Sequence, residues 1–148
     1  MQRRAHVFFS AMLGVLAGKL LAHSIAGIYA GLLVAVVAGV VPDLDLGYRH
    51  RAALHNLLAC TVLSLLAYYA GSLYSRNMGL LAAASFGSGF LGHLFLDMLT
   101  VRGVALFYPI SSKRYRVARL RSNSRAANMV IELVSLLLLV VVFLSPLG

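Results

Sequence analysis

The length, composition and charge of this 148-residue chain indicate one domain, residues 1–148, that lies in a lipid bilayer. Hydrophobic residues make up 61% of the sequence and charged residues only 11%, which excludes an ordinary soluble domain. The 13 Lys and Arg residues against 4 Asp and Glu residues give a net charge of +9, which in such a chain indicates membrane lipid as the partner and argues against nucleic acid.

Apolar runs along the chain predict about five transmembrane helices. A bilayer core requires about 20 mostly apolar residues per helix. The candidate spans cover residues 6–21, 24–41, 53–73, 78–99 and 129–147. We therefore expect an all-α fold, a polytopic membrane helix bundle. For the first run a cleaved signal peptide stays open as an alternative, because Arg3 and Arg4 precede it and small residues lie near Ala22.

Small residues within the predicted spans indicate close helix packing. Gly14 and Gly18 are four residues apart, as are Gly27 and Gly31, and this spacing lets helix backbones approach one another in lipid. Cys60, the single cysteine, lies in an apolar run, where we expect a packing role and no disulfide.

The distribution of basic residues predicts the orientation in the membrane. With five spans, the N-terminus, the loop after Val41 and the loop after Leu99 share one side, which carries 11 of the 13 Lys and Arg residues. The other side carries only Lys19 and Arg76. Because loops rich in Lys and Arg stay in the cytoplasm, we expect an integral cytoplasmic membrane protein whose basic loops face the cytoplasm.

All four acidic residues and four of the five histidines fall near the predicted cytoplasmic ends of the spans, although they are spread over 126 positions. The set is His6, Asp43, Asp45, His50, His55, His93, Asp97 and Glu132. An ionised side chain in the hydrocarbon core costs about 2.5 to 3.5 kcal/mol, so these carboxylates require compensation. A divalent cation accepts imidazole nitrogen and carboxylate oxygen together, so the sequence predicts a metal site.

Each element of this set also has an interpretation without metal. The aspartates after the second span fit a turn, the histidines beside them fit an interface, and Glu132 fits a salt bridge with an arginine. His93 and Asp97, four residues apart on one helical face, fit a buried pair. Their joint placement at one end favours the metal, whereas His23, at the opposite end without a nearby carboxylate, fits an ordinary interfacial residue.

The same residues resemble the membrane-bound metal-dependent hydrolase family of the YdjM type. That family's pattern has an early His, a Pro-Asp-x-Asp-His turn, a His-Arg-Gly-x-x-His-Ser segment and a Gly-His-x-x-x-Asp helix. The corresponding pieces here are His6 and residues 42–45, 50–55 and 92–97, and residues 100–103, Pro109, the basic loop and Glu132 are also similar. Three positions depart from the pattern: Leu46 replaces His, Ala52 replaces Gly and Asn56 replaces Ser.

The resemblance implies a metal-dependent hydrolase, which we expect to act at the cytoplasmic leaflet on a phosphoester of a lipid or lipid-linked molecule. The expected metal is Zn, with Mn or Fe as alternatives, in a site that is mononuclear or dinuclear. The candidate metal ligands are His6, Asp43, His50, His55, His93 and Asp97. Asp45 and Glu132 are the candidate general bases, and the alternative for each is to be a further ligand or to orient the ligands.

The basic residues beside the site are expected to hold anionic head groups. The candidates are Arg51, Lys113, Arg114 and Arg116, and the alternative is that this loop only fixes the topology. Two other functions stay open: a non-catalytic membrane scaffold clamped by metal, and an ion or proton transporter. Transport would need polar groups across the bilayer, and residues 133–144 offer only Ser135.

Overall fold

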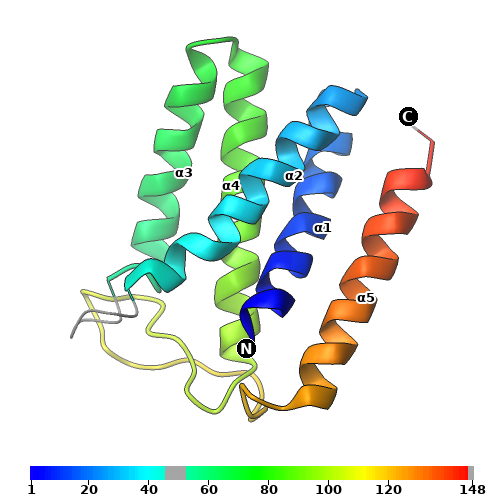
Figure 1. Cartoon of the computed structure of the whole chain (residues 1–148). Helices are drawn as coiled ribbons and strands as arrows, with labels where there is room; N and C mark the ends of the chain where they lie inside the picture. Colours follow the sequence, from blue (N-terminus) through cyan, green and yellow to red (C-terminus); the bar gives the residue numbers. More distant parts are fainter. Residues whose placement is uncertain (46–52, 147–148) are drawn as a thin grey trace.

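Helices make up the bundle that the computed structural model shows for residues 1–45 and 53–146 (Figure 1). The elements are α1 (Arg3–Ala22), α2 (Ile25–Val40), the 3-10 helix η1 (Val41–Asp45), α3 (Leu57–Ser72), α4 (Arg76–Met98) and α5 (Arg125–Leu144). The described residues contain two isolated β-bridges and no strand. The predicted all-α membrane bundle is therefore confirmed.

Four helices are long and apolar enough to cross a membrane: α1, α2 together with η1, α4 and α5. The fifth, α3, has 16 residues and a length of about 24 Å. It begins four residues later than predicted, because Asn56 has extended backbone and acts as its N-cap. The Asn56 side chain accepts a hydrogen bond from the Ala59 N–H at 2.8 Å and donates one to the Ala53 carbonyl at 2.8 Å.

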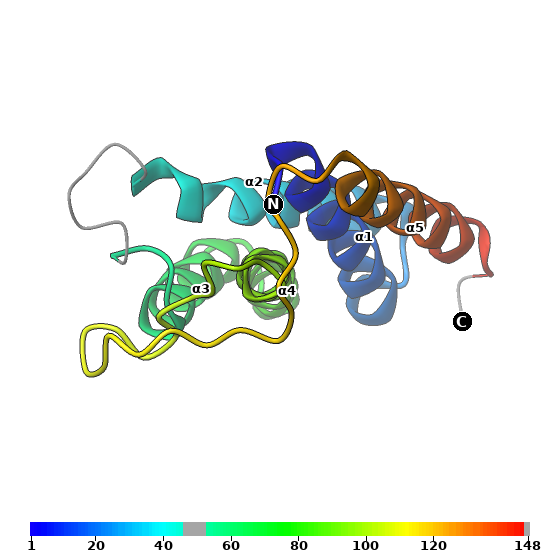
Figure 2. The ribbon, with the colours of Figure 1, turned by 90° about the horizontal axis from the view of Figure 1, so that it is seen from below.

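One end of the bundle collects most of the chain's connections (Figure 1). The beginnings of α1, α3 and α5 and the ends of η1 and α4 all lie there, together with the segment 99–124, and we call it the loop end. Figure 2 shows this end from below, with α3 and α5 on opposite sides of the bundle. The predicted topology, in which the basic loops share one side, therefore matches the helix order in space.

Close backbone contacts join the three central helices. Helices α1, α2 and α4 all pack against one another, whereas α3 packs on α4, and α5 packs on α1 with one ring contact between its Phe143 and Tyr29 of α2. A Cβ atom on Gly14 of α1 would overlap the Gly31 carbonyl of α2, so this crossing tolerates no side chain at that position. The predicted role of the small residues in close packing is confirmed here.

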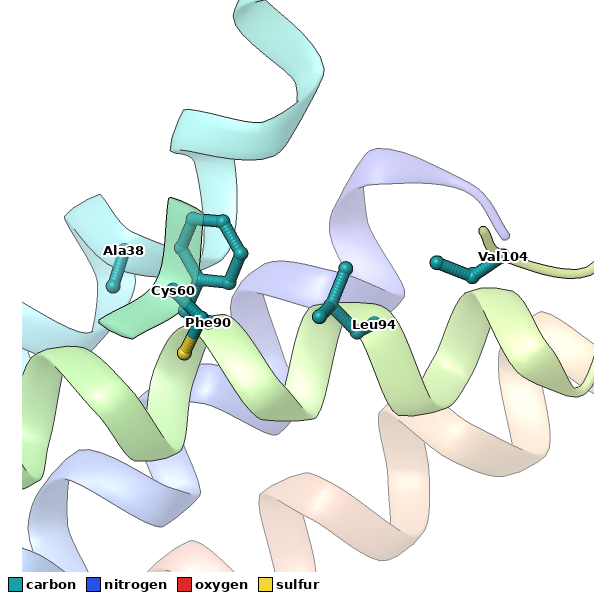
Figure 3. Close-up of a cluster of buried hydrophobic side chains, with 5 residues drawn as sticks. All are labelled: Ala38, Cys60, Phe90, Leu94 and Val104. Atoms are coloured by element: carbon teal, nitrogen blue, oxygen red, sulfur yellow. The ribbon is translucent and has the colours of Figure 1, made fainter. Parts of the chain in front are cut away.

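The segment 99–124 is anchored to the bundle by backbone and side-chain contacts. Val104 and Tyr115 exchange two backbone hydrogen bonds of 2.9 and 2.8 Å, and Leu57 N–H at the start of α3 donates to the Leu106 carbonyl at 2.9 Å. Val104 also belongs to a buried apolar cluster with Ala38, Cys60, Phe90 and Leu94 (Figure 3). This segment therefore has a fixed position over the loop end, and Cys60 has the packing role expected of it.

Candidate metal centre

Five of the predicted site residues meet at the loop end, and we call them the His–Asp cluster. His6 comes from the first turn of α1, Asp43 from η1, His55 from the residues before α3, and His93 and Asp97 from the last turns of α4. The cluster contains two overlapping groups of three residues, and within each group the possible ligand atoms lie within 4.8 Å of one another. One group is His6, His93 and Asp97, and the other is Asp43, His55 and His93.

The separations within the cluster suit ligands of a shared ion better than direct hydrogen bonds. His93 Nε2 lies 3.5 Å from Asp97 Oδ2 and 3.7 Å from Asp43 Oδ1. His55 Nε2 lies 3.7 Å from Asp97 Oδ2, and His6 Nε2 lies 3.3 Å from Asp97 Oδ1. Hydrogen bonds from N–H to oxygen span about 2.7–3.2 Å, whereas ligands of a tetrahedral zinc ion with bonds of about 2.0–2.1 Å lie about 3.3–3.4 Å apart.

The hydrogen bonding of His93 indicates a cation between the carboxylates. His93 Nδ1 lies 2.7 Å from the Gly39 carbonyl, which can only accept, so Nδ1 carries the proton and donates it. In the neutral ring, Nε2 then has a lone pair, and it is buried with no hydrogen-bond partner among the described residues. This lone pair lies 3.7 Å from an Asp43 oxygen and 3.5 Å from an Asp97 oxygen, so the arrangement calls for a positive charge between them, either a proton on Nε2 or a metal ion that all three groups bind. The residues present therefore fit a divalent metal.

Helix α1 reaches the cluster because Gly39 leaves room for it. Ser10 of α1 packs where a Gly39 side chain would be, and its hydroxyl donates to the Gly89 carbonyl of α4 at 3.1 Å. One turn earlier, the buried His6 ring stacks on the His93 ring with a centroid distance of 3.9 Å and an angle of 21°. The triple contact of α1, α2 and α4 thus sets the distance between these two imidazoles.

The end of α4 is held by contacts that fix Asp97. Thr100 Oγ1 donates to the Asp97 backbone carbonyl at 2.8 Å. The Met1 ammonium group donates to Asp97 Oδ1 at 2.9 Å, and the Asn128 side chain accepts the Gln2 N–H at 2.8 Å. The beginning of α1 and the beginning of α5 are thereby tied to the same place as the carboxylate.

A cavity of about 240 Å³ adjoins the His–Asp cluster and gives it access from the loop end. Its wall includes every member of the cluster except His93, together with Arg102 and Arg114 of the segment 99–124. The Asp43 and Asp97 side chains are 15% and 22% exposed, whereas His93 is completely buried. A molecule in the cavity would therefore meet the two carboxylates, with His93 behind them.

The other predicted site residues have different positions. Glu132 is half-buried about two turns into α5, outside the cavity wall and outside both ligand groups. Among the described residues, no cationic side chain lies within salt-bridge distance of it. His50 and Arg51 lie outside the described residues, as do Leu46 and Ala52, and for Asp45 the structure describes only the backbone.

Of the predicted head-group residues, Arg114 lines the cavity. The Lys113 ammonium lies 5.7 Å from the centre of the Tyr115 ring, and Arg116 Nη1 donates to the Val101 carbonyl at 3.3 Å. The proposed binding role of Lys113 and Arg116 stays a prediction, and their contacts lie within the segment 99–124 itself.

Gly39, Arg102 and Asn128 were not among the predicted site residues, although Arg102 was one of the 11 basic residues that predicted the orientation. Gly39 acts through a carbonyl oxygen, which every residue has, so no spacing of side chains could have identified it. Arg102 lies within residues 100–103, which were noted as similar to the family pattern, and that was the available indication. Asn56 departs from the family's Ser but caps α3 equally well, so this departure leaves the local structure intact.

Comparison with known proteins relates the chain to a family of membrane proteins. The sequence model of the YdjM inner membrane protein family matches residues 1–146, and this range includes the whole His–Asp cluster. A search of curated proteins and a search of solved structures each gave no match.

Proposed function

This chain belongs to the YdjM inner membrane protein family, and we propose that it is a membrane-embedded metal-dependent hydrolase. The observation that carries the proposal is His93 Nε2, a buried atom without a hydrogen-bond partner among the described residues, which lies 3.5 and 3.7 Å from two carboxylates beside a cavity. A buried polar atom without a hydrogen-bond partner costs free energy in a purely structural histidine, and a bound metal ion would satisfy it.

In the group of His6, His93 and Asp97 the imidazole nitrogens lie 3.3 and 3.5 Å from the carboxylate, against 3.9 and 3.7 Å in the other group, and His6 and His93 are almost completely buried. Asp43 and His55 complete the set at the rim of the cavity. Nitrogen and carboxylate donors suit Zn best, with Mn and Fe as alternatives. A divalent ion held by these residues supplies a Lewis acid that polarises a phosphoryl oxygen and acidifies water.

The protein's own residues orient the reacting groups. The Gly39 carbonyl holds the His93 ring in one tautomer, and Thr100 holds the end of α4 so that Asp97 keeps its position. Asp45 is the candidate general base that lies nearest in sequence to the cluster, since it ends the 3-10 helix that carries Asp43. Glu132, the other candidate, would have to act from α5.

The proposed substrate is a phosphoester of a lipid or lipid-linked molecule at the cytoplasmic leaflet. The cavity lies at the loop end, which carries most of the basic residues, and this sign of charge favours the cytoplasmic side. Each Lys or Arg close to an anionic membrane surface contributes about 1 kcal/mol to the attraction between the protein and that surface. The loop end would thus concentrate anionic head groups where the cluster is accessible.

The two alternative functions explain less of the structure. A transporter needs a polar path through the bundle, but Phe90 and Leu94, on either side of His93 in α4, are buried in an apolar cluster (Figure 3). A metal clamp needs the ligands but has no use for an adjoining cavity that Arg102 and Arg114 line. We therefore favour hydrolysis.

The test is metal analysis of protein purified in detergent, followed by hydrolysis assays on a panel of phospholipids and soluble phosphoesters. Asp97→Asn should remove most of the metal and the hydrolysis while circular dichroism shows the parent's helicity. Glu132→Gln, the same chemical change on α5, should keep its metal. A parent protein without metal would refute the proposal, and metal without any hydrolysis would favour the clamp. Ion flux into sealed vesicles would favour transport.

A further inference from the structure

Arg102 lies in a tight turn whose position is fixed relative to Asp97. Thr100 Oγ1 bonds the Asp97 carbonyl at 2.8 Å, and the Gly103 N–H bonds the Thr100 carbonyl at 3.2 Å. Gly103 has a φ of +60°, and a Cβ there would lie 2.6 Å from the Tyr115 carbonyl oxygen. The turn therefore requires glycine, and it places Arg102 on the cavity wall a few residues after the cluster's carboxylate.

The guanidinium groups of Arg102 and Arg114 have unused hydrogen-bond donors. Both residues line the cavity, and neither makes a salt bridge or side-chain hydrogen bond within residues 1–45 and 53–146. Their basic neighbours differ, since Arg116 donates to a backbone carbonyl and Lys113 lies over the Tyr115 ring. The two arginines on the cavity wall are thus available to an anion.

The charges around the cavity suit a doubly charged anion. The cluster contributes the carboxylates of Asp43 and Asp97, which a divalent cation would offset. Arg102 and Arg114 then leave at least two positive charges, and the Met1 ammonium has the same sign. A phosphomonoester carries about −1.5 to −2 charges at pH 7, whereas a phosphodiester carries one. The planar guanidinium group also binds phosphate through two parallel hydrogen bonds.

The size of the cavity limits what enters it. Its volume of about 240 Å³ lies below the range of about 300–1,000 Å³ that is usual for drug-sized ligands. A phosphate group with a short part of the attached molecule fits, whereas acyl chains would have to stay in the bilayer.

We infer that Arg102 and Arg114 bind the terminal phosphate of a phosphomonoester in this cavity, beside the His–Asp cluster. The inference rests on the proposed function, because the same cluster would have to hold the metal that offsets its carboxylates. Arg102 is then a specificity-determining residue, since it selects the dianionic monoester over the diester. The phosphate can belong to a lipid head group or to a soluble molecule.

The first test measures the binding of inorganic phosphate to zinc-loaded protein in detergent by isothermal titration calorimetry. Arg102→Gln and Arg114→Gln should each weaken binding roughly tenfold or more, because each removes a charge-assisted hydrogen-bonding group. Arg119→Gln, at an exposed arginine of the same segment that does not line the cavity, should bind phosphate like the parent. Dimethyl phosphate, a singly charged diester, should bind at least tenfold more weakly than phosphate.

The same titrations separate the two proposals. Metal content is measured on every sample, so a parent protein without metal would reject the proposed function. If the metal-loaded parent does not bind phosphate, the phosphate subsite alone is rejected. The same follows if Arg102→Gln and Arg114→Gln bind phosphate as tightly as the parent does. Equal binding of the diester would reject the selectivity for monoesters.

Two further ligands then identify the source of the phosphate. Vesicles of phosphatidylcholine with and without phosphatidic acid test the lipid, and glycerol 3-phosphate tests the soluble monoester. If the affinity for one of these two ligands falls at least tenfold in Arg102→Gln, the subsite is supported and that ligand identifies the source of the phosphate. Binding that is the same in the parent and in Arg102→Gln for both ligands would overturn the inference.

Discussion

Replacement of Gly39 by alanine should weaken metal binding without unfolding the bundle. The Gly39 carbonyl accepts the hydrogen bond from His93, and its missing side chain leaves room for Ser10 of α1. A Cβ on Gly39 would lie 2.7 Å from the Ser10 Cβ, whereas carbon atoms in contact prefer about 3.5–4.0 Å. Helices α1 and α2 would therefore separate by roughly 1 Å at this point.

That separation acts on the cluster through His6, which lies one turn before Ser10 on α1. Metal sites keep their bond lengths within about 0.2 Å, so a displacement several times larger removes His6 from the ligand set or strains it. We expect zinc affinity to fall about 10- to 100-fold, as it does when ligand-orienting residues are changed. Overpacking costs about 1–3 kcal/mol, which the bundle should tolerate.

The assay is zinc titration against a competing chelator, with circular dichroism to check folding. Gly87→Ala on α4 is the matched control, because a Cβ there meets only Ser64, at 3.2 Å or more. Adding Ser10→Gly to Gly39→Ala removes the clashing atoms and should restore most of the affinity. A folded Gly39→Ala protein that binds zinc as tightly as the parent would refute the geometric argument.

Two further predictions concern the attachment of α5. Asn128→Ala should lower the free energy of unfolding by about 1–3 kcal/mol, because this buried amide accepts a backbone N–H before α1 and donates to two carbonyls before α5. Thermal unfolding measures this, and an unchanged melting temperature would contradict it. Lys19→Met should speed hydrogen exchange at the end of α5 and leave metal content unchanged, since Lys19 Nζ donates to the Val142 carbonyl at 2.6 Å and to Ser145. Equal exchange in both proteins would show that Lys19 does not hold that end.

The sequence predicted the positions of the helices well because hydropathy is summed over about 20 residues. The predicted spans 6–21 and 78–99 differ from α1 and α4 by at most three residues at either end. The start of α3 was missed because one side chain decides it. Asn56 caps the helix, and the apolar residues before it do not extend the helix backwards.

Membership of the His–Asp cluster could be predicted because helix order alone brings these residues to one end. Which face of each helix turns toward the bundle could not be predicted, because helices that are apolar on all sides give no amphipathic pattern. Glu132 illustrates this limit. Like the other site residues it lies near the predicted cytoplasmic end of its span, but its helix α5 packs on α1 at the side of the bundle. The cavity and its arginine wall depend on the course of the segment 99–124, which no periodicity describes.

The sharing of His93 between the two ligand groups makes them compete for one nitrogen atom. An imidazole nitrogen has one lone pair, so His93 Nε2 can bind one ion at a time, although both groups contain it. Among the described residues, an ion held by His6, His93 and Asp97 Oδ1 leaves Asp43, His55 and the second Asp97 oxygen for another ion. Filling one position with His93 therefore removes a ligand from the other, and the Asp97 carboxylate is the group that could bridge two ions.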